Sequence, residues 1–175
     1  MRRFDIVFRV PCLALALGLV SCGCASSYSW KSSVPADVRT VSVPTFRNES
    51  EVMELGSVAA RQISREIQRE GTFRLAPEDD AALEIQGVIK SAKLGYDASD
   101  RTIRRRMATY DFSATAVVSV IDRRTHKVLV DNRSYVARVV LTSGQDLSTA
   151  KRDASGRLMD DLSRQVVDDL LNMKW

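Results

Sequence analysis

The clearest pattern in the chain is a strict alternation of apolar and polar residues over positions 110–120. The apolar positions share one face of an extended strand: Tyr110, Phe112, Ala114, Ala116, Val118 and Val120. The polar residues 122–127 predict a hairpin turn, and residues 128–140 return as a second long strand. At about 3.3 Å per residue, strands of this length approach 40 Å, which exceeds the usual length of a strand.

Two other segments also predict strands. Residues 38–43 are rich in β-branched side chains and stop at Pro44. Residues 82–94 alternate between apolar and polar side chains until Gly87, where the phase of the alternation changes. This glycine predicts a β-bulge or the close approach of another backbone. Residues 96–106, which are polar and basic, predict a loop.

Apolar residues at three- and four-residue steps predict two amphipathic helices. The stripe of the first helix consists of Val52, Leu55, Ala59, Ile63 and Ile67. The stripe of the last helix consists of Ala154, Leu158, Leu162, Val166, Leu170 and Met173. Asn48 and Glu51 have the pattern of a capping box for the first helix, and Gly71 provides its C-terminal stop.

The predicted order of elements is therefore βαβββα. Because each helix has one apolar stripe, both helices are expected to cover the same face of the sheet. We predict an α+β fold, a two-layer sandwich in which two helices pack on one face of a four-stranded mixed, mostly antiparallel sheet.

The N-terminal segment has the features of a secretory signal peptide. A lead with three arginines precedes an apolar run over residues 10–20, which is shorter than the roughly 20 residues of a membrane-spanning helix. The run ends in Leu19, Val20 and Ser21 before Cys22, a sequence that resembles the lipoprotein box of bacterial lipoproteins.

This resemblance implies that the cysteine is cleaved free and acylated. We expect a covalent lipid on Cys22, palmitate included, and no other cofactor. A soluble secreted protein in which Cys22 and Cys24 pair or stay free is the alternative, but a loop of one intervening residue strains a disulfide. Gly23 stands where an aspartate would signal inner-membrane retention, so the expected location is the outer membrane, on its periplasmic side.

These features divide the chain into three parts. Residues 1–21 are the expected lipoprotein signal peptide, residues 22–36 a lipid-anchored tether, and residues 37–175 the folded domain. Removing the signal peptide takes away three arginines and one aspartate, so the formal charge falls from +4 to about +2. A charge this small argues against a nucleic-acid partner.

Recognisable catalytic chemistry is missing from the sequence. The one histidine, His126, falls in a predicted turn, and there is no His/Cys cluster for a metal, no glycine-rich phosphate loop and no Gly-x-Ser-x-Gly elbow. We therefore predict that the protein is not an enzyme.

Clustered arginines are the strongest candidates for ligand binding. Four of them fall within six residues, at Arg101, Arg104, Arg105 and Arg106. Guanidinium groups bind phosphates in a bidentate manner, so this segment predicts an anion site, with a lipid phosphate the best-placed partner. Lys151 and Arg152 form a smaller cluster before the last helix. A solvated loop and ordinary helix-terminal charge are the alternatives.

Taken together, these residues resemble the LptE family of outer-membrane lipopolysaccharide-assembly lipoproteins. The resemblance covers residues 22–175. It rests on the lipobox cysteine followed by glycine, on the sequence of residues 41–48 before a helix, and on that of residues 80–89. One departure concerns the tether, since the family often has Cys-Gly-Tyr at the anchor, whereas the first aromatic residue here is Tyr28.

The resemblance implies a non-enzymatic plug inside a large outer-membrane β-barrel protein (LptD-like), held to the membrane by its N-terminal lipid. It also implies that the protein helps to assemble this barrel and binds lipopolysaccharide during export. The residues that would contact lipopolysaccharide are Arg101, Arg104, Arg105, Arg106 and Lys151.

Two alternatives belong to other classes. A curli-type or similar secretion lipoprotein that oligomerises in the outer membrane has a similar opening strand, but it carries extra transmembrane hairpins of about ten alternating residues. An envelope hydrolase would need a catalytic constellation that the sequence lacks.

Overall fold

The computed structural model describes residues 34–96, 109–142 and 147–175, all of which belong to the unit Ser32–Trp175. Three long strands are flanked by two long helices, three short strands and two 3-10 turns. In chain order the elements are η1 (Ala36–Val38), β1 (Thr40–Ser42), β2 (Arg47–Asn48), α2 (Leu55–Glu70), β3 (Arg74–Leu75), η2 (Glu78–Asp80), β4 (Leu83–Tyr96), β5 (Thr109–Asp122), β6 (Lys127–Thr142) and α3 (Leu147–Leu171).

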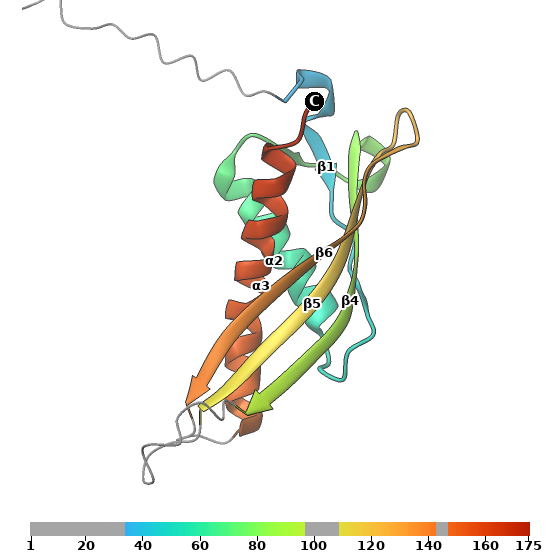
Figure 1. The fold of residues 1–175 in the computed structure, drawn as a ribbon. Helices are drawn as coiled ribbons and strands as arrows, with labels where there is room; N and C mark the ends of the chain where they lie inside the picture. The colour runs from blue at the N-terminus through green and yellow to red at the C-terminus, as the bar shows by residue number, and fades with distance from the viewer. Residues whose placement is uncertain (1–33, 97–108, 143–146) are drawn as a thin grey trace, which may run out of the picture. The chain divides into compact units, whose positions relative to one another are not determined.

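The strands form one mixed sheet in the order β3-β1-β4-β5-β6, and β2 pairs separately with β4. The long strands β4, β5 and β6 are antiparallel, whereas the pairings made by β1 and β2 are parallel. Helices α2 and α3 lie side by side on one face of the sheet (Figure 1). The predicted α+β fold is confirmed, and the sheet gains the two-residue strands β2 and β3.

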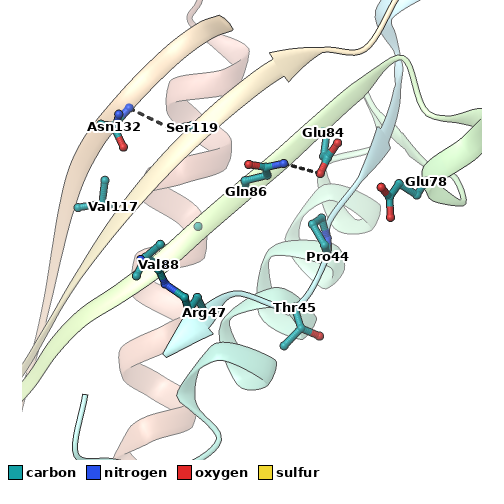
Figure 2. Close-up of a pocket in the computed structure, with 11 residues that line it drawn as sticks. Pro44, Thr45, Arg47, Glu78, Glu84, Gln86, Val88, Val117, Ser119 and Asn132 are labelled. Carbon is teal, nitrogen blue, oxygen red and sulfur yellow. Dashed lines mark hydrogen bonds between the residues drawn. The ribbon is translucent and has the colours of Figure 1, made fainter. Parts of the chain in front are cut away.

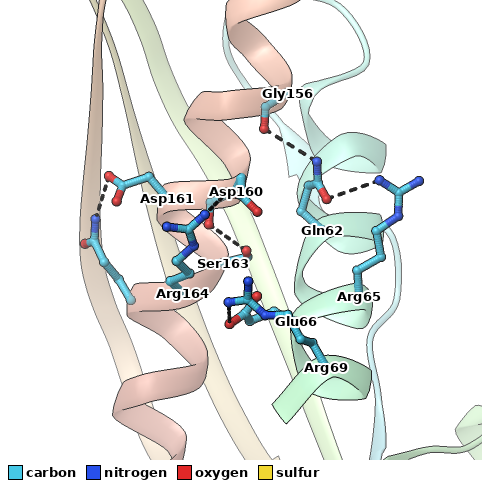
Figure 3. Close-up of polar contacts among 10 residues, drawn as sticks. Gln62, Arg65, Glu66, Arg69, Gly156, Asp160, Asp161, Ser163 and Arg164 are labelled. Atoms are coloured by element: carbon cyan, nitrogen blue, oxygen red, sulfur yellow. Dashed lines mark hydrogen bonds and ion pairs between the residues drawn. The ribbon is translucent and has the colours of Figure 1, made fainter.

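The core lies between the helices and the inner face of the sheet. Every predicted inward residue of β5 from Phe112 to Val120 is at most 3% exposed, whereas Tyr110 is half-buried. The predicted stripe residues that lie inside α2 and α3 are buried in the same core, and Val52 and Met173, which fall outside the two helices, are half-buried. Figure 3 shows where the helices also meet through polar groups, with the Gln62 amide donating to the carbonyl of Gly156 at 3.5 Å. The alternation and the helical stripes therefore predicted the core correctly.

Helix α2 begins later than the capping pattern predicted. It starts at Leu55, and its N-cap is Glu54, which has a φ of 65° and makes no side-chain cap. Asn48 instead closes a local turn, in which its Oδ1 accepts the amide of Ser50 at 3.0 Å and its Nδ2 donates to the carbonyl of Val52 at 2.8 Å. The Asn48 cap was wrong because this side chain bonds within the preceding turn. The stop at Gly71 is confirmed, since its φ is +82° and its amide bonds to Ile67.

Phe46 explains the phase change at Gly87. A Cβ atom on this glycine would lie 2.0 Å from Cε2 of the buried Phe46 ring, so the ring occupies the space of a side chain. The close approach comes from a side chain and not from a backbone. The bulge lies further along the strand, between Ile89 and Ser91.

Ion pairs link the β5–β6 turn to the two 3-10 turns. Arg123 donates to Glu78 at 2.9 Å and to Glu84 at 2.7 Å, and Arg124 donates to Asp37 at 2.7 Å. Glu84 is only 8% exposed, so the guanidinium of Arg123 compensates a carboxylate that has lost most of its water.

We expect Gly87→Ala to lower the free energy of unfolding by about 1–3 kcal/mol, because the new methyl group must displace the Phe46 ring. Gly95→Ala is the matched control in the same strand, since its Cβ would lie an ordinary 3.6 Å from the nearest atom, the Asp111 carbonyl oxygen. Urea denaturation of the two variants measures the difference. Equal stability of both variants would contradict the packing role of Phe46.

Candidate functional site

Of the residues predicted to act in binding, the structure places Lys151. It lies in the second turn of α3 and is half-buried. Cys22, Arg101, Arg104, Arg105 and Arg106 lie outside the described residues.

The chain on either side of the arginine-rich segment is described. Tyr96 at the end of β4 pairs with Tyr110, and Thr109 at the start of β5 pairs with Thr142 at the end of β6. These strand ends and the beginning of α3 lie at the same end of the sheet (Figure 1). The segment that carries the four arginines is thus attached at the end of the sheet where Lys151 lies.

Lys151 lines a groove of about 610 Å³ along the exposed edge of β4. The groove exists because β2 pairs with β4 only at Val88 and Ile89, so within the described ranges no strand covers that edge from Lys90 onward. The lining residues come from β4, from the segment before α2, and from β5 and α3: Glu49, Ser50, Glu51, Val52, Lys90, Ser91, Ala92, Lys93, Leu94, Phe112 and Lys151.

The groove combines cations with an apolar floor. Phe112 is fully buried, and Ala92 and Leu94 pack partly buried against the core. Neither Lys93 nor Lys151 forms an ion pair within the described part of the chain. Cationic groups beside apolar surface suit an amphiphile with an anionic head.

Lys90 is already paired. Its ammonium lies 3.0 Å from Glu49 Oε2, and Arg47 bonds to the other oxygen of the same carboxylate. The hydrogen bond from Lys90 is the largest cause that lowers the pKa of Glu49 below its ordinary value of 4.5. Because the pKa is lowered, the ion pair is present at neutral pH and is lost only as the pH falls through that lowered value.

A second hollow, of about 480 Å³, lies on the face of the sheet away from the helices (Figure 2). Its polar groups largely bond to one another, with the side chain of Gln86 donating to Glu84 at 2.8 Å and the backbone N–H of Asn132 donating to Ser119 Oγ at 3.0 Å. Glu78 and Glu84 also line it, with Arg47 as the basic residue of the described lining, so its lining carries less positive charge than that of the groove beside Lys151. In that groove Lys90, Lys93 and Lys151 outnumber Glu49 and Glu51, which favours a phosphate more.

His126 is exposed in the β5–β6 turn with a φ of 54°, as the turn prediction requires. The described ranges hold no cluster of three or more His, Cys, Asp or Glu side chains that could bind a metal. Among the described helices, none has the length and apolar character needed to cross a membrane.

Sequence reasoning missed Lys90 and Lys93. Each is a single lysine within a strand, without neighbouring basic residues to mark it. The signal that could have indicated them was the phase change after Gly87. Strand β4 has its bulge at Lys90, and beyond this point it no longer pairs with the parallel strand β2, so its edge borders the groove.

Comparisons with known proteins give a family and a fold. The family model described as "LptE: Lipopolysaccharide-assembly" matches residues 38–172. No curated protein matches the chain. A hypothetical protein from Chlamydia trachomatis is similar in structure, with a TM-score of 0.56 at 17% identity, over 77% of this chain and 96% of that one.

A second solved structure is described as a neuraminyllactose-binding hemagglutinin homolog from Helicobacter pylori. It is similar with a TM-score of 0.51 at 12% identity, over 79% of this chain and 89% of that one. At such low identity, both structures support the fold alone.

We expect Lys90→Gln to raise the pKa of Glu49 toward 4.5, because the substitution removes the largest cause of the lowered value. A ¹³C NMR titration of the glutamate carboxyl groups measures this change. Lys127→Gln, on the exposed start of β6, removes the same charge without touching Glu49 and serves as the control. An unchanged Glu49 titration in Lys90→Gln would show that this contact is not formed in solution.

Proposed function

Because the chain belongs to the LptE family of lipopolysaccharide-assembly proteins, we propose that it is a non-catalytic outer-membrane lipoprotein that binds lipopolysaccharide during export and partners a β-barrel translocon. The family match covers all three long strands and both helices. The role therefore concerns the whole folded domain and not an appended segment.

The observation that carries the ligand-binding part is the groove beside Lys151. It places this residue and Lys93, neither of which is ion-paired within the described ranges, next to Leu94 and other apolar side chains. Lipopolysaccharide offers phosphates to the lysines and acyl chains to the apolar floor. The proposed site residues are Lys151 together with Arg101, Arg104, Arg105 and Arg106, whose segment joins the chain at this end of the sheet.

The proposed anchor is a lipid on Cys22. Removal of residues 1–21 would leave this cysteine at the N-terminus, 12 residues before the described domain begins at Val34. A cysteine with two or more acyl chains holds a protein stably on a bilayer. The anchor would therefore keep the domain on the periplasmic side of the outer membrane, close to its barrel.

The proposed partner is a large β-barrel protein of the LptD type, with this domain as its plug and assembly factor. The strands β5 and β6 support this arrangement over that of a pore-forming oligomer. Their inner side chains include Phe112 and Ala137, which are at most 1% exposed and belong to the core that β5 and β6 share with α3. These strands are thus needed inside the domain and are not spare membrane hairpins.

Neutralising the proposed site should weaken ligand binding. We expect the variant Arg104→Gln, Arg105→Gln, Arg106→Gln and Lys151→Gln to bind purified lipopolysaccharide at least about tenfold more weakly, because several charge-assisted contacts are lost. Surface plasmon resonance on the detergent-solubilised full chain measures the affinity.

A matched control removes four exposed positive charges elsewhere: Arg74→Gln, Lys127→Gln, Arg157→Gln and Lys174→Gln. We expect it to bind like the wild type. Wild-type affinity in the site variant would show that the site assignment is wrong, and equal loss in both variants would show that binding follows net charge alone.

Affinity purification of the lipidated protein from membranes tests the partner. We expect a stoichiometric complex with one outer-membrane barrel of much greater mass, identified by mass spectrometry. A ring of this chain alone in detergent would instead favour the oligomerising secretion lipoprotein.

A further inference from the structure

The exposed face of α2 carries three arginines four residues apart: Arg61, Arg65 and Arg69. Such residues are neighbours on a helix, and like charges at this spacing destabilise it. Arg69 is compensated by an ion pair with Glu66. Arg61 and Arg65 have no carboxylate within 4.0 Å in the described part of the chain, and Arg65 bonds only to the neutral amide of Gln62, at 3.4 Å (Figure 3).

These two arginines line a groove of about 400 Å³ between α2 and the connection from β1 to β2. The connection runs close to the helix because Gly56 lets the Phe46 carbonyl approach, and a Cβ on Gly56 would lie 2.1 Å from that oxygen. The lining consists of Val43, Thr45, Ser57, Ala60, Arg61, Ser64 and Arg65. It contains no acidic residue.

The arginines are the main free donors in this groove. The hydroxyl of Ser57 donates to the Glu54 carbonyl at 2.9 Å, and that of Ser64 donates to the Ala60 carbonyl at 2.8 Å. Both serine hydroxyls therefore already donate to backbone carbonyls, whereas most N–H groups of Arg61 and Arg65 have no hydrogen-bond acceptor in the described part of the chain. Guanidinium pairs without a competing carboxylate match the geometry and charge of a phosphate.

We propose that Arg61 and Arg65 form a phosphate-binding site on α2. The ligand is a phosphate group, carried by a lipid headgroup or free in solution. The site shares no lining residue with the groove beside Lys151. It therefore goes beyond the proposed lipopolysaccharide site, and the test of one site does not decide the other.

The test uses the full chain in detergent micelles and follows the arginine Nε–Hε signals by ¹H–¹⁵N NMR. Arg61→Gln and Arg65→Gln, made singly, assign the two signals. The probes are inorganic phosphate, a short-chain phosphatidylglycerol and purified lipopolysaccharide, each compared with chloride at equal ionic strength.

We expect saturable shifts of both signals with at least one phosphate probe. The affinity should fall at least about tenfold in the double variant Arg61→Gln/Arg65→Gln, because two charge-assisted contacts are lost. The control Arg74→Gln/Arg157→Gln removes two exposed arginines outside the groove and should bind like the wild type. The double variant should also melt no lower than the wild type, since no ion pair is broken.

The probes identify the source of the phosphate. Saturation by inorganic phosphate as well as lipid indicates a general phosphate site, and saturation by a lipid probe alone indicates a headgroup site. Shifts that chloride reproduces would show a solvated helix face and would overturn the proposal, as would wild-type affinity in the double variant.

Discussion

The packing of Phe46 is the constraint on which much of the structure depends. Its ring fills the space above Gly87 of β4, and its carbonyl lies against Gly56 of α2. One buried residue thus joins the short strand region, the long sheet and the first helix. Burial of a phenylalanine contributes about 1.5–3 kcal/mol, and both contacts require a glycine as the partner.

The grooves follow from the same junction. Because β2, which follows Phe46, pairs with β4 over only two residues, no strand of the described ranges covers the edge of β4 from Lys90 onward, and this edge borders the groove beside Lys151. Because Gly56 admits the backbone closely, the connection before Phe46 forms the second wall beside Arg61 and Arg65. Lys90 and Lys93 thereby lie with the distant Lys151 beside one groove, and Arg61 and Arg65 lie beside the other.

Some of the basic side chains around these grooves are paired with a carboxylate, and others are not. Arg123 and Arg124 are tied to carboxylates that include the buried Glu84, and Lys90 is tied to Glu49. The exposed pairs, such as Lys90 with Glu49 and Arg124 with Asp37, add little stability, whereas Arg123 compensates the buried carboxylate of Glu84. Lys93, Lys151 and Arg61 have no carboxylate within 4.0 Å in the described ranges.

The sequence by itself determined the core and the class of fold. The alternation along β5 and the stripes of α2 and α3 depend only on local periodicity, and most of these residues are buried as predicted, with Tyr110, Val52 and Met173 half-buried. The role of Asn48 was missed because its side chain bonds within the turn before α2. The ring beside Gly87 was missed because it comes from Phe46, about 40 residues away in the sequence. The groove around Lys151 was also decided by tertiary structure. It depends on where β2 stops pairing with β4, and this pairing joins residues about 40 positions apart that no local pattern relates.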